Sequence, residues 1–240
     1  MATYASPDVA YVLIGEDPWQ AYLNTLTIKT DAVLADVTPL GTAWRTMADT
    51  GLRSGEVTCA GFYDGTKTGM NTVSATDRVV SVLLEGNTRS KRFYGVRAAV
   101  VSAAEVGISS DSVHTSTPGI TVRGNIDFGY VVAPVAARTT AGNTQSTYAD
   151  AGASMTAPRA YLHVTSLTLG GYTNLVVTLQ SCATSGGSYD DETAFTAVTA
   201  AGAQSIAISG DVNRYLAVKW AWTGAGTGQS ATFFVGVAPA

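Results

Sequence analysis

Apolar and polar residues alternate along much of the chain, and this period of two predicts β-strands in both halves. Leu26 and Ile28 share one face of an early strand. Leu175, Val177 and Leu179 share one face of a strand in the second half. No long amphipathic helix is predicted, so the predicted fold class is all-β. Further strands are predicted at residues 11–14, 56–63, 78–85, 92–101, 120–122, 126–132, 160–164, 205–209, 214–222 and 231–237.

Some of these segments also predict how the strands are placed. The run over 78–85 is apolar on both faces, which indicates a central strand. Gly86 and Asn87 turn the chain into the run over 92–101, and the two runs are predicted to form a hairpin. The run over 126–132 alternates clearly, and its shared face holds Ile126, Phe128, Tyr130 and Val132.

A long stretch from Asp31 to Gly55 has no clear period, and it contains a proline and three glycines. The sequence predicts a long loop here, with a short helix over Thr42–Asp49 as the most that is regular. Ordered loops of this length are uncommon unless they have a function. Three large apolar residues lie among its polar residues, namely Leu34, Trp44 and Met47.

Composition changes near Pro134, and residues 136–158 are rich in Ala, Thr, Gly and Ser. We therefore predict two domains, over 1–135 and 136–240. In the second domain, regularly spaced strands joined by Gly- and Ser-rich turns predict a β-sandwich.

Charged residues make up only 13% of the chain and hydrophobic residues 46%. A surface with few ions is cheap to desolvate, which favours a subunit that is buried against copies of itself. The net charge is −4, and no basic patch is present of the kind that binds phosphates. We interpret the densest basic run, Arg89, Lys91, Arg92 and Arg97, as a solvated face, so specific nucleic-acid binding is not predicted.

The residues that could support catalysis are few. His163 lies in a predicted strand and His114 in a Ser- and Thr-rich segment, and no nucleophile elbow accompanies them. Cys59 and Cys182 each lie in a strand pattern, without a C-x-x-C pair, and are predicted to be small buried hydrophobes. We therefore predict no catalytic residue and no enzymatic activity.

Three other motifs have a structural and a functional reading. Asp190-Asp191-Glu192 is predicted to be a solvated loop tip, with weak calcium binding as the alternative. Gly224–Gly228 is predicted to be a hairpin turn, because no Lys-Ser/Thr follows it as in a phosphate-binding loop. Trp220 and Trp222 share a strand face with Leu216 and Val218, which favours a core position over a sugar-binding platform. No cofactor and no metal ion are predicted.

The N-terminus, from Met1 to Asp8, has neither a basic region nor an apolar core, so no signal peptide is expected. No apolar run approaches the roughly 20 residues of a membrane span. The protein is therefore expected to be made and to mature in a cytoplasm.

Several segments resemble major tail tube proteins of long-tailed (siphovirus-like) bacteriophages, and the second half resembles the Ig-like decoration domain that many of them carry. The first-half segments are Leu26–Lys29, Gly51–Thr58, Phe62–Gly65, Leu83–Gly86, Arg92–Ala98, Gly119-Ile120 and Ile126–Gly129. The second-half segments are Tyr161–Val164, Leu175–Ser181 and Arg214–Val218.

The resemblance implies a tail-tube-type β-sandwich or barrel over 1–135, followed by an Ig-like β-sandwich over 136–240 on the tube exterior. It implies a structural virion protein whose copies form hexameric or pseudo-hexameric rings that stack into a tail tube, together with other tail proteins. DNA would pass through the lumen without being bound, which fits the negative net charge. The subunit would be assembled in the host cytoplasm, and no membrane is involved.

In such a tube the long loop of one ring reaches the neighbouring ring. Leu34, Trp44 and Met47 are then the candidate inter-ring contacts, and the alternative is that they fold back onto their own sandwich. Two other functions stay open at this point. A capsid decoration or head accessory protein has less need of the loop, and a carbohydrate-binding module would expose Trp220 and Trp222.

Overall fold

The computed structural model describes residues 11–36, 47–64, 73–108 and 114–239, and for residues 33, 34 and 48–53 it describes the strand alone. These residues form β-strands joined by turns and a 3₁₀ turn, η2 (Gln145–Thr147), with no α-helix among them. The all-β prediction is therefore confirmed. No helix within these ranges has the length and hydropathy needed to span a bilayer.

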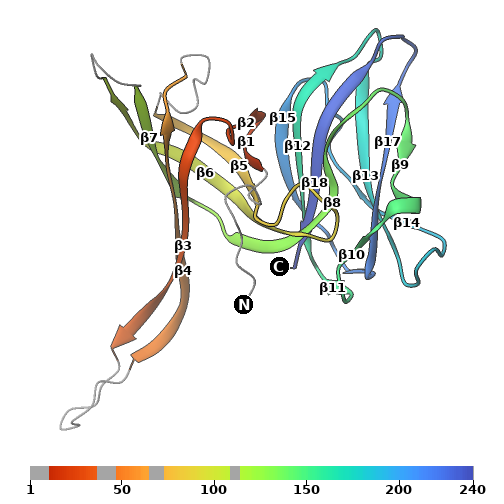
Figure 1. Cartoon of the computed structure of the whole chain (residues 1–240). Helices are drawn as coiled ribbons and strands as arrows, with labels where there is room; N and C mark the ends of the chain where they lie inside the picture. The colour runs from red at the N-terminus through yellow and green to blue at the C-terminus, as the bar shows by residue number, and fades with distance from the viewer. Residues whose placement is uncertain (1–10, 37–46, 65–72, 109–113, 240) are drawn as a thin grey trace. The chain divides into compact units, whose positions relative to one another are not determined.

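The chain divides into two compact units (Figure 1). Unit 1 comprises the residues up to Ala21, Arg78–Arg97 and the residues from Asp127 onward, and unit 2 comprises Tyr22–Asp77 and Ala98–Ile126. Two long strands, β5 (Ser74–Leu83) and β6 (Arg92–Gly107), contribute residues to both units.

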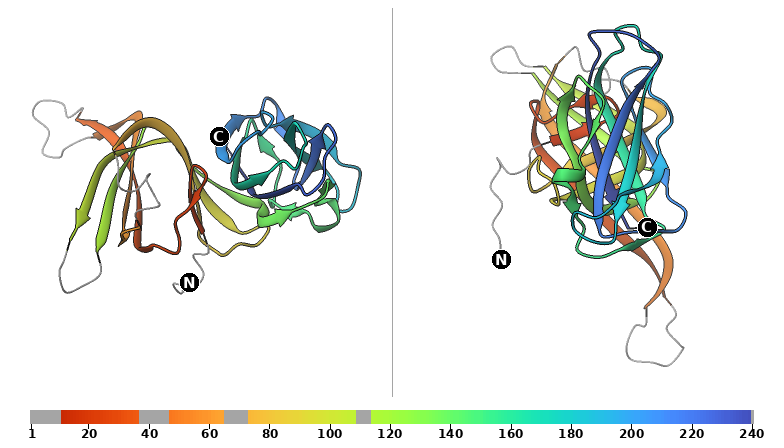
Figure 2. Two further views of the ribbon diagram at one scale, coloured as in Figure 1. Left: turned by 90° about the horizontal axis from the view of Figure 1, so that it is seen from above. Right: turned by 90° about the vertical axis from the view of Figure 1, so that its right-hand side faces the viewer.

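Unit 1 is built around a β-sandwich. One sheet contains the run β15-β12-β18-β8, and the other has the order β10-β17-β13-β14 with β9 also paired to β17. In the view from above, these strands surround a common interior (Figure 2). Besides parts of β5 and β6, unit 1 contains β1 (Tyr11–Ile14), β2 (Asp17–Pro18), β8 (Ile126–Arg138), β9 (Gly142–Asn143), β10 (Ala149–Asp150), β11 (Met155–Thr156), β12 (Arg159–Thr168), β13 (Asn174–Cys182), β14 (Asp190–Ala194), β15 (Gly202–Ala207), β16 (Asp211–Val212), β17 (Tyr215–Thr223) and β18 (Ser230–Ala238).

Alternate residues of β12 and β18 face the sandwich core. Leu162 of β12 is opposite Val235 of β18, and both are fully buried against residues of the other sheet, such as Leu179 and Val218. Trp220 and Trp222 of β17 are half-buried at the margin of this core. The predicted inward alternation of Leu175, Val177 and Leu179 in β13 is confirmed, since all three are buried.

The opposite faces of β12 and β18 are buried as well. Tyr161 and Phe234 join Leu13, Phe93 and Val131 in a second apolar cluster within unit 1. The rings of Phe93 and Tyr161 meet edge to face at 5.6 Å, and those of Phe93 and Phe234 at 5.5 Å. Glycine is required here, because a Cβ at Gly95 would lie 2.6 Å from the Tyr161 ring and one at Gly236 would lie 2.6 Å from the Phe93 ring.

This second cluster draws residues from both sides of the predicted boundary between residues 135 and 136. Leu13, Leu83, Phe93 and Val131 precede that boundary, whereas Tyr161 follows it. The boundary itself falls inside β8. Independent domains over 1–135 and 136–240 stay a prediction, which a truncation described in the Discussion tests.

Unit 2 consists of β3 (Leu23–Asp36), β4 (Met47–Phe62), β7 (Thr115–Val122) and the adjoining ends of β5 and β6. β4 pairs with β3 on one side and with β7 on the other, and β7 continues to β6. The buried hydrophobic side chains among its described residues are small or medium-sized, namely Val57, Cys59, Ala99, Val101 and Ile120. The largest fully buried side chains of the described ranges all belong to unit 1.

Several expectations about local structure are confirmed. The strand over 11–14 is β1, and the runs over 78–85 and 92–101 lie in β5 and β6, which neighbour each other in the sheet as the hairpin prediction requires. The end of β5, from Val80 to Leu83, is buried at every position and lies between β6 and β1, so the central position is also confirmed.

The predicted long loop over 31–55 is wrong for the residues that the structure describes. Asp31–Asp36 continue β3, and Met47–Gly55 begin β4. The short helix predicted over Thr42–Asp49 is also wrong at Met47–Asp49, which belong to the strand, and its other residues lie outside the described ranges. The strands form because the backbones of β3 and β4 pair with each other, and such hydrogen bonds do not require an alternating side-chain pattern.

Three turn and surface predictions are wrong in ways that affect the search for sites. Asp190–Glu192 are in strand β14 and not at a loop tip. Gly224–Gly228 do not close a hairpin, because β17 before them and β18 after them belong to different sheets. The basic run from Arg89 to Arg97 is not a uniformly solvated face, because Arg97 forms an ion pair with Asp127 and the Arg92 guanidinium lies 4.0 Å above the Tyr130 ring.

Candidate assembly surface

One part of unit 2 is a ribbon of two strands that pair with each other and with no other strand among the described residues. β7 pairs with β4 only over Glu56–Phe62, whereas β3 and β4 remain paired from Thr30 opposite Gly55 to Asp36 opposite Met47. The ribbon, defined as Thr30–Asp36 and Met47–Gly55, thus has no third strand among the described residues. Figure 1 shows β3 and β4 continuing together past the rest of unit 2. Seven residues of extended strand give the ribbon a length of about 24 Å.

The outer strand of this ribbon is also a sheet edge. Within the described ranges β3 pairs with β4 alone, so one side of its 14 residues faces no other strand. An edge of this length presents backbone N–H and C=O groups that can pair with another chain. Lys29 and Asp31 lie on β3 and form an exposed ion pair with 2.7 Å between Nζ and Oδ2. Charged residues on an edge limit unselective pairing.

Large apolar side chains are exposed mainly in unit 2. Ile108 is 81% exposed and Val73 is 60% exposed, and Phe62, Tyr63 and Met47 are 40–45% exposed. Phe62 is opposite Thr115, which is also opposite Gly107, so Phe62, Tyr63 and Ile108 lie at the same end of the sheet β4-β7-β6. Exposed apolar groups that gather on one unit indicate a surface for a partner.

The three site residues predicted from the sequence are placed only in part. Leu34 lies in β3 opposite Asp49, and Met47 is the first residue of β4, opposite Asp36, with 40% of its surface exposed. Both therefore belong to the ribbon and not to a loop. Trp44 lies outside the described residues. A role for all three in contacts between rings stays a prediction.

His163 is fully buried in β12 and has no acidic partner among the described residues. Its Nδ1 atom is 2.8 Å from the carbonyl oxygen of Gly15, and its Nε2 atom is 2.9 Å from the Ser81 hydroxyl. A carbonyl oxygen only accepts, so Nδ1 carries the proton and Nε2 accepts from Ser81. Burial lowers the pKa of His163 to about 4, which keeps the imidazole neutral. This is a structural histidine that connects β12 to two other segments of unit 1.

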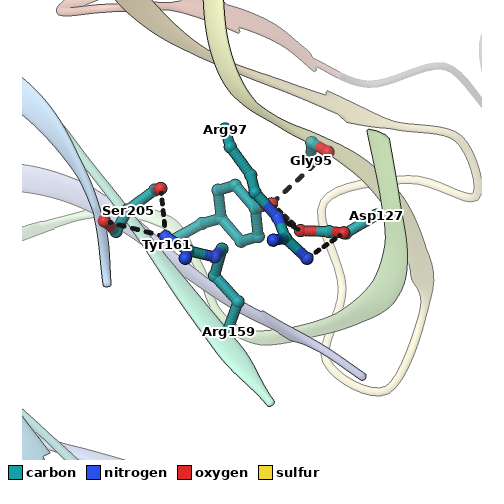
Figure 3. A network of polar contacts seen from close by, with 6 residues as sticks. All are labelled: Gly95, Arg97, Asp127, Arg159, Tyr161 and Ser205. Carbon is teal, nitrogen blue, oxygen red and sulfur yellow. Dashed lines mark hydrogen bonds and ion pairs between the residues drawn. The ribbon is translucent and has the colours of Figure 1, made fainter. Parts of the chain in front are cut away.

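An ionic network that the sequence did not reveal lies at the start of β8. Asp127 is 6% exposed, and both of its carboxylate oxygens accept hydrogen bonds of 2.8 Å from Arg97 (Figure 3). The Tyr161 hydroxyl donates to the same carboxylate and lies 3.5 Å from the carbonyl oxygen of Gly95. Burial and the adjacent carboxylate raise the pKa of Tyr161, and the hydrogen bonds to Asp127 raise the pKa of Arg97.

The contacts of this network indicate a structural role. Both oxygens of the Asp127 carboxylate already accept hydrogen bonds. Arg159, two residues before Tyr161, donates instead to the backbone and hydroxyl oxygens of Ser205. The buried Asp127 carboxylate is thus compensated by a partly buried guanidinium and a buried hydroxyl, which connects β8 to β6 and β12. One signal of the network is present in the sequence, because a charged residue in the alternating run 126–132 needs a partner if that position is buried.

The remaining candidates for chemistry are engaged in structural contacts. Asp191 accepts from Lys219 at 2.5 Å and from Gln180 at 2.7 Å, and Glu192 accepts from Ser181. Within the described part of the chain, no group of three or more His, Cys, Asp or Glu side chains is placed to hold a metal ion. Cys59 and Cys182 are buried free thiols, and burial raises the pKa of Cys59 to about 12.

Comparison with known proteins assigns no family. No family model matches the chain, and no curated protein matches it. Among solved structures it is similar to a chain from the tail of an empty gene transfer agent particle, with a TM-score of 0.38 and 15% identity over 52% of this chain and 98% of that one. A chain from the virion of a native gene transfer agent gives a TM-score of 0.38 and 17% identity over the same shares.

A third similar structure is the SPP1 Dit protein, described as a paradigm of the hub adsorption apparatus in phages that infect Gram-positive bacteria. It gives a TM-score of 0.35 and 13% identity, and the match covers 95% of this chain and 98% of that one. TM-scores below 0.5 assign neither a fold family nor a function to the chain.

Proposed function

We propose that this chain is a structural subunit of a phage tail, that unit 2 joins copies of it into rings, and that the rings stack into the tail tube. The observation that carries the proposal is the ribbon of Thr30–Asp36 and Met47–Gly55. Its two strands pair with each other and with no third strand among the described residues. The chain has no enzymatic role in this proposal, and its place is the virion tail.

The physical argument starts from the weakness of isolated hairpins. A two-stranded ribbon is marginally stable in water, because it buries little apolar surface and exposes its backbone groups on both sides. A second copy of the chain that pairs with the open side of β3 would satisfy those backbone groups. A closed ring of copies leaves no edge unpaired, and this removes the tendency of an open edge to aggregate.

The exposed apolar residues of unit 2 would add a second favourable contribution to the free energy of assembly, beside the pairing of the β3 edge. Phe62, Tyr63 and Ile108 lie at one end of the sheet, where a neighbouring subunit would bury them. A large side chain contributes about 1.5–3 kcal/mol when it passes from full exposure to full burial, so Phe62 and Tyr63, at 45% and 41% exposure, would each contribute less than half of that. With 13% charged residues, the chain has few ions to desolvate in such a contact.

The tail assignment within this class of self-assembling proteins rests on the sequence resemblance to tail tube proteins. In that setting the C-terminal sandwich lies on the outside of the tube, and Leu34, Trp44 and Met47 contact the neighbouring ring. DNA passes through the lumen without specific binding, as the net charge of −4 per subunit favours. Other tail proteins are the expected partners at the tube ends.

A ribbon deletion tests the proposal. Ala32 and Arg53 are paired across the two strands, so an Asn-Gly turn in place of residues 33–52 closes the hairpin in the same register. The purified wild type is expected to form rings or hollow tubes of constant width in negative-stain electron microscopy across a concentration series. The shortened variant is expected to fold and to remain a small particle at about tenfold higher concentration.

The matched control inserts Asn-Gly after Gly186, an exposed turn of unit 1 where a Cβ would have no neighbour within 4 Å. This control is expected to assemble like the wild type. Normal tubes from the shortened variant would remove the ribbon from the proposal. Uniform small particles of the wild type at every concentration would contradict self-assembly and favour the decoration or carbohydrate-binding alternatives.

A further inference from the structure

Unit 1 contains a pocket that neither the fold nor the proposed assembly requires. Its volume is about 350 Å³, at the lower end of the range for small-molecule sites of about 300–1,000 Å³. Arg89 comes from the segment between β5 and β6, and Arg138 comes from β8. The rest of the lining is Pro134, Ala136, Asn143, Thr144 and Trp220. None of these residues is acidic, although the chain as a whole is negative.

Arg138 is held over aromatic rings and not by a carboxylate. Its guanidinium lies 5.0 Å from the centre of the Trp220 ring and 4.7 Å from that of Phe233. One Nη atom donates to the carbonyl oxygen of Pro134 at 3.3 Å, and Nε is buried without a hydrogen-bond partner. Stacking on two rings fixes the plane of the guanidinium while leaving its charge without a counter-ion.

Arg89, like Arg138, has a buried hydrogen-bond donor for which the described residues provide no acceptor. Its Nε atom is buried without a hydrogen-bond partner. Burial lowers the pKa of Arg89, and burial together with repulsion from Arg89 lowers the pKa of Arg138. Both arginines line the same pocket, and the positive charge of Arg89 disfavours that of Arg138. By contrast, Arg97 and Arg214 each form a bidentate pair with an aspartate.

Two half-buried guanidinium groups of like charge are costly to hold in one pocket lining, and an anion between them would offset that cost. Guanidinium groups bind carboxylate and phosphate oxygens in a planar, two-pronged geometry. Two positive charges and no acid in the lining match a doubly charged oxyanion better than a singly charged one. The volume leaves room for a small organic substituent, and Trp220 and Pro134 give that space an apolar wall.

We propose that this pocket is a binding site for a phosphate group, free or as the ester of a small polyol or sugar, held between Arg89 and Arg138. Asn143 and Thr144 line the same space and supply polar groups of the kind that orient such a ligand. The site stands independently of the assembly role, because all of its residues belong to unit 1.

Calorimetric titration at constant ionic strength tests the site with three probes: inorganic phosphate, glycerol 3-phosphate and acetate. Saturable binding of phosphate or glycerol 3-phosphate is expected, with acetate at least about tenfold weaker because it carries one charge. Tighter binding of glycerol 3-phosphate than of inorganic phosphate indicates an ester as the ligand, and the reverse order indicates free phosphate. Absence of saturable binding by both phosphate probes would overturn the proposal.

Substitution locates the binding. Arg89→Gln and Arg138→Gln are each expected to weaken phosphate binding at least about tenfold, the loss of one charge-assisted contact. Lys91→Gln is the matched control: it removes the same charge from an exposed side chain two residues from Arg89, outside the pocket. An equal loss in the control, or full binding in both arginine variants, would refute the site.

Thermal unfolding separates binding from folding. Without phosphate, Arg89→Gln is expected to unfold at or above the wild-type temperature, because the variant no longer repels Arg138. With phosphate at ten times the wild-type dissociation constant, the wild type is expected to gain about 3 °C and the variant at most about 1 °C. A variant that is already unstable without phosphate would show that Arg89 has a structural role and would contradict the proposal.

Discussion

The buried imidazole of His163 makes a quantitative prediction about stability in mild acid. In the folded chain the ring is fully buried, donates from Nδ1 to Gly15 and accepts at Nε2 from Ser81. Protonation at Nε2 would leave a buried charge facing a hydroxyl that can no longer donate to it. The pKa of His163 is accordingly lowered to about 4, mainly because burial disfavours the charged form.

The direction in which stability changes with pH follows from the proton binding of the folded and unfolded chains. In the unfolded chain the histidine binds a proton as the pH falls through about 6.5, whereas in the folded chain it does so only near 4. Between these values the unfolded state binds more protons, so stability is complete above pH 6.5 and is lost as the pH falls towards 4. The full difference corresponds to about 3 kcal/mol, of which about 2 kcal/mol is already lost at pH 5.

Urea unfolding of the wild type and of His163→Gln, followed by tryptophan fluorescence at pH 7.5 and pH 5.0, measures how much unfolding free energy is lost in acid because of His163. Glutamine does not titrate, so the wild type is expected to lose about 2 kcal/mol more than the variant between the two pH values. His114→Gln is the matched control, because the chain has only these two histidines, and it should keep the wild-type pH dependence.

Proton NMR gives an independent readout. The imidazole resonance that is absent from His163→Gln should not shift between pH 7 and pH 5 in the folded wild type. A resonance that titrates near pH 6.5, or an equal loss of stability in the wild type and in His163→Gln, would refute the assignment of a buried neutral histidine.

The other predictions concern the ionic network, the exposed apolar surface and the domain boundary. Asp127→Ala is expected to lower the free energy of unfolding by about 3 kcal/mol, because it leaves a partly buried charge on Arg97, and Tyr161→Phe by about 1.5 kcal/mol; equal effects in urea unfolding would contradict the network. Phe62→Ser is expected to raise the concentration needed for assembly about tenfold, whereas Phe128→Ser, a residue of similar exposure in unit 1, should leave it unchanged in sedimentation measurements. Removal of residues 136–240 tests the predicted boundary: independent domains require the remaining fragment to unfold cooperatively in circular dichroism, whereas loss of the cooperative transition would show that the apolar cluster around Phe93 needs Tyr161 and Phe234.

Local alternation was enough to locate many of the strands. The predicted strand over 11–14 coincides with β1, and the inward set of Leu175, Val177 and Leu179 is buried in β13. Both results follow from a property of single segments, because successive side chains of a strand point to opposite faces whatever the strand pairs with. Low charge and the lack of a nucleophile motif likewise limited the function to a few classes before any contact was known.

The same pattern did not determine which face of a strand is covered. Ile126, Phe128 and Tyr130 share a face of β8 as predicted, yet this is the more exposed face, while Asp127 on the other face is buried. A carboxylate becomes tolerable there only because Arg97 and Tyr161 reach it from β6 and β12. Partners 30 and 34 residues away along the chain leave no local trace.

Long-range pairing also decided the features on which the proposals rest. The ribbon exists because residues 30–36 meet residues 47–55 backbone to backbone, and such hydrogen bonds are independent of side-chain pattern. Arg89 and Arg138 face one pocket. His163 is neutral because it is buried, and its partners Gly15 and Ser81 lie 148 and 82 residues away along the chain. Local sequence pattern and composition were enough to predict an all-β chain with few charges and without a catalytic motif. The tertiary structure decided which charges are paired, which edge is open and where a ligand fits, because each of these depends on groups that are distant in sequence and adjacent in space.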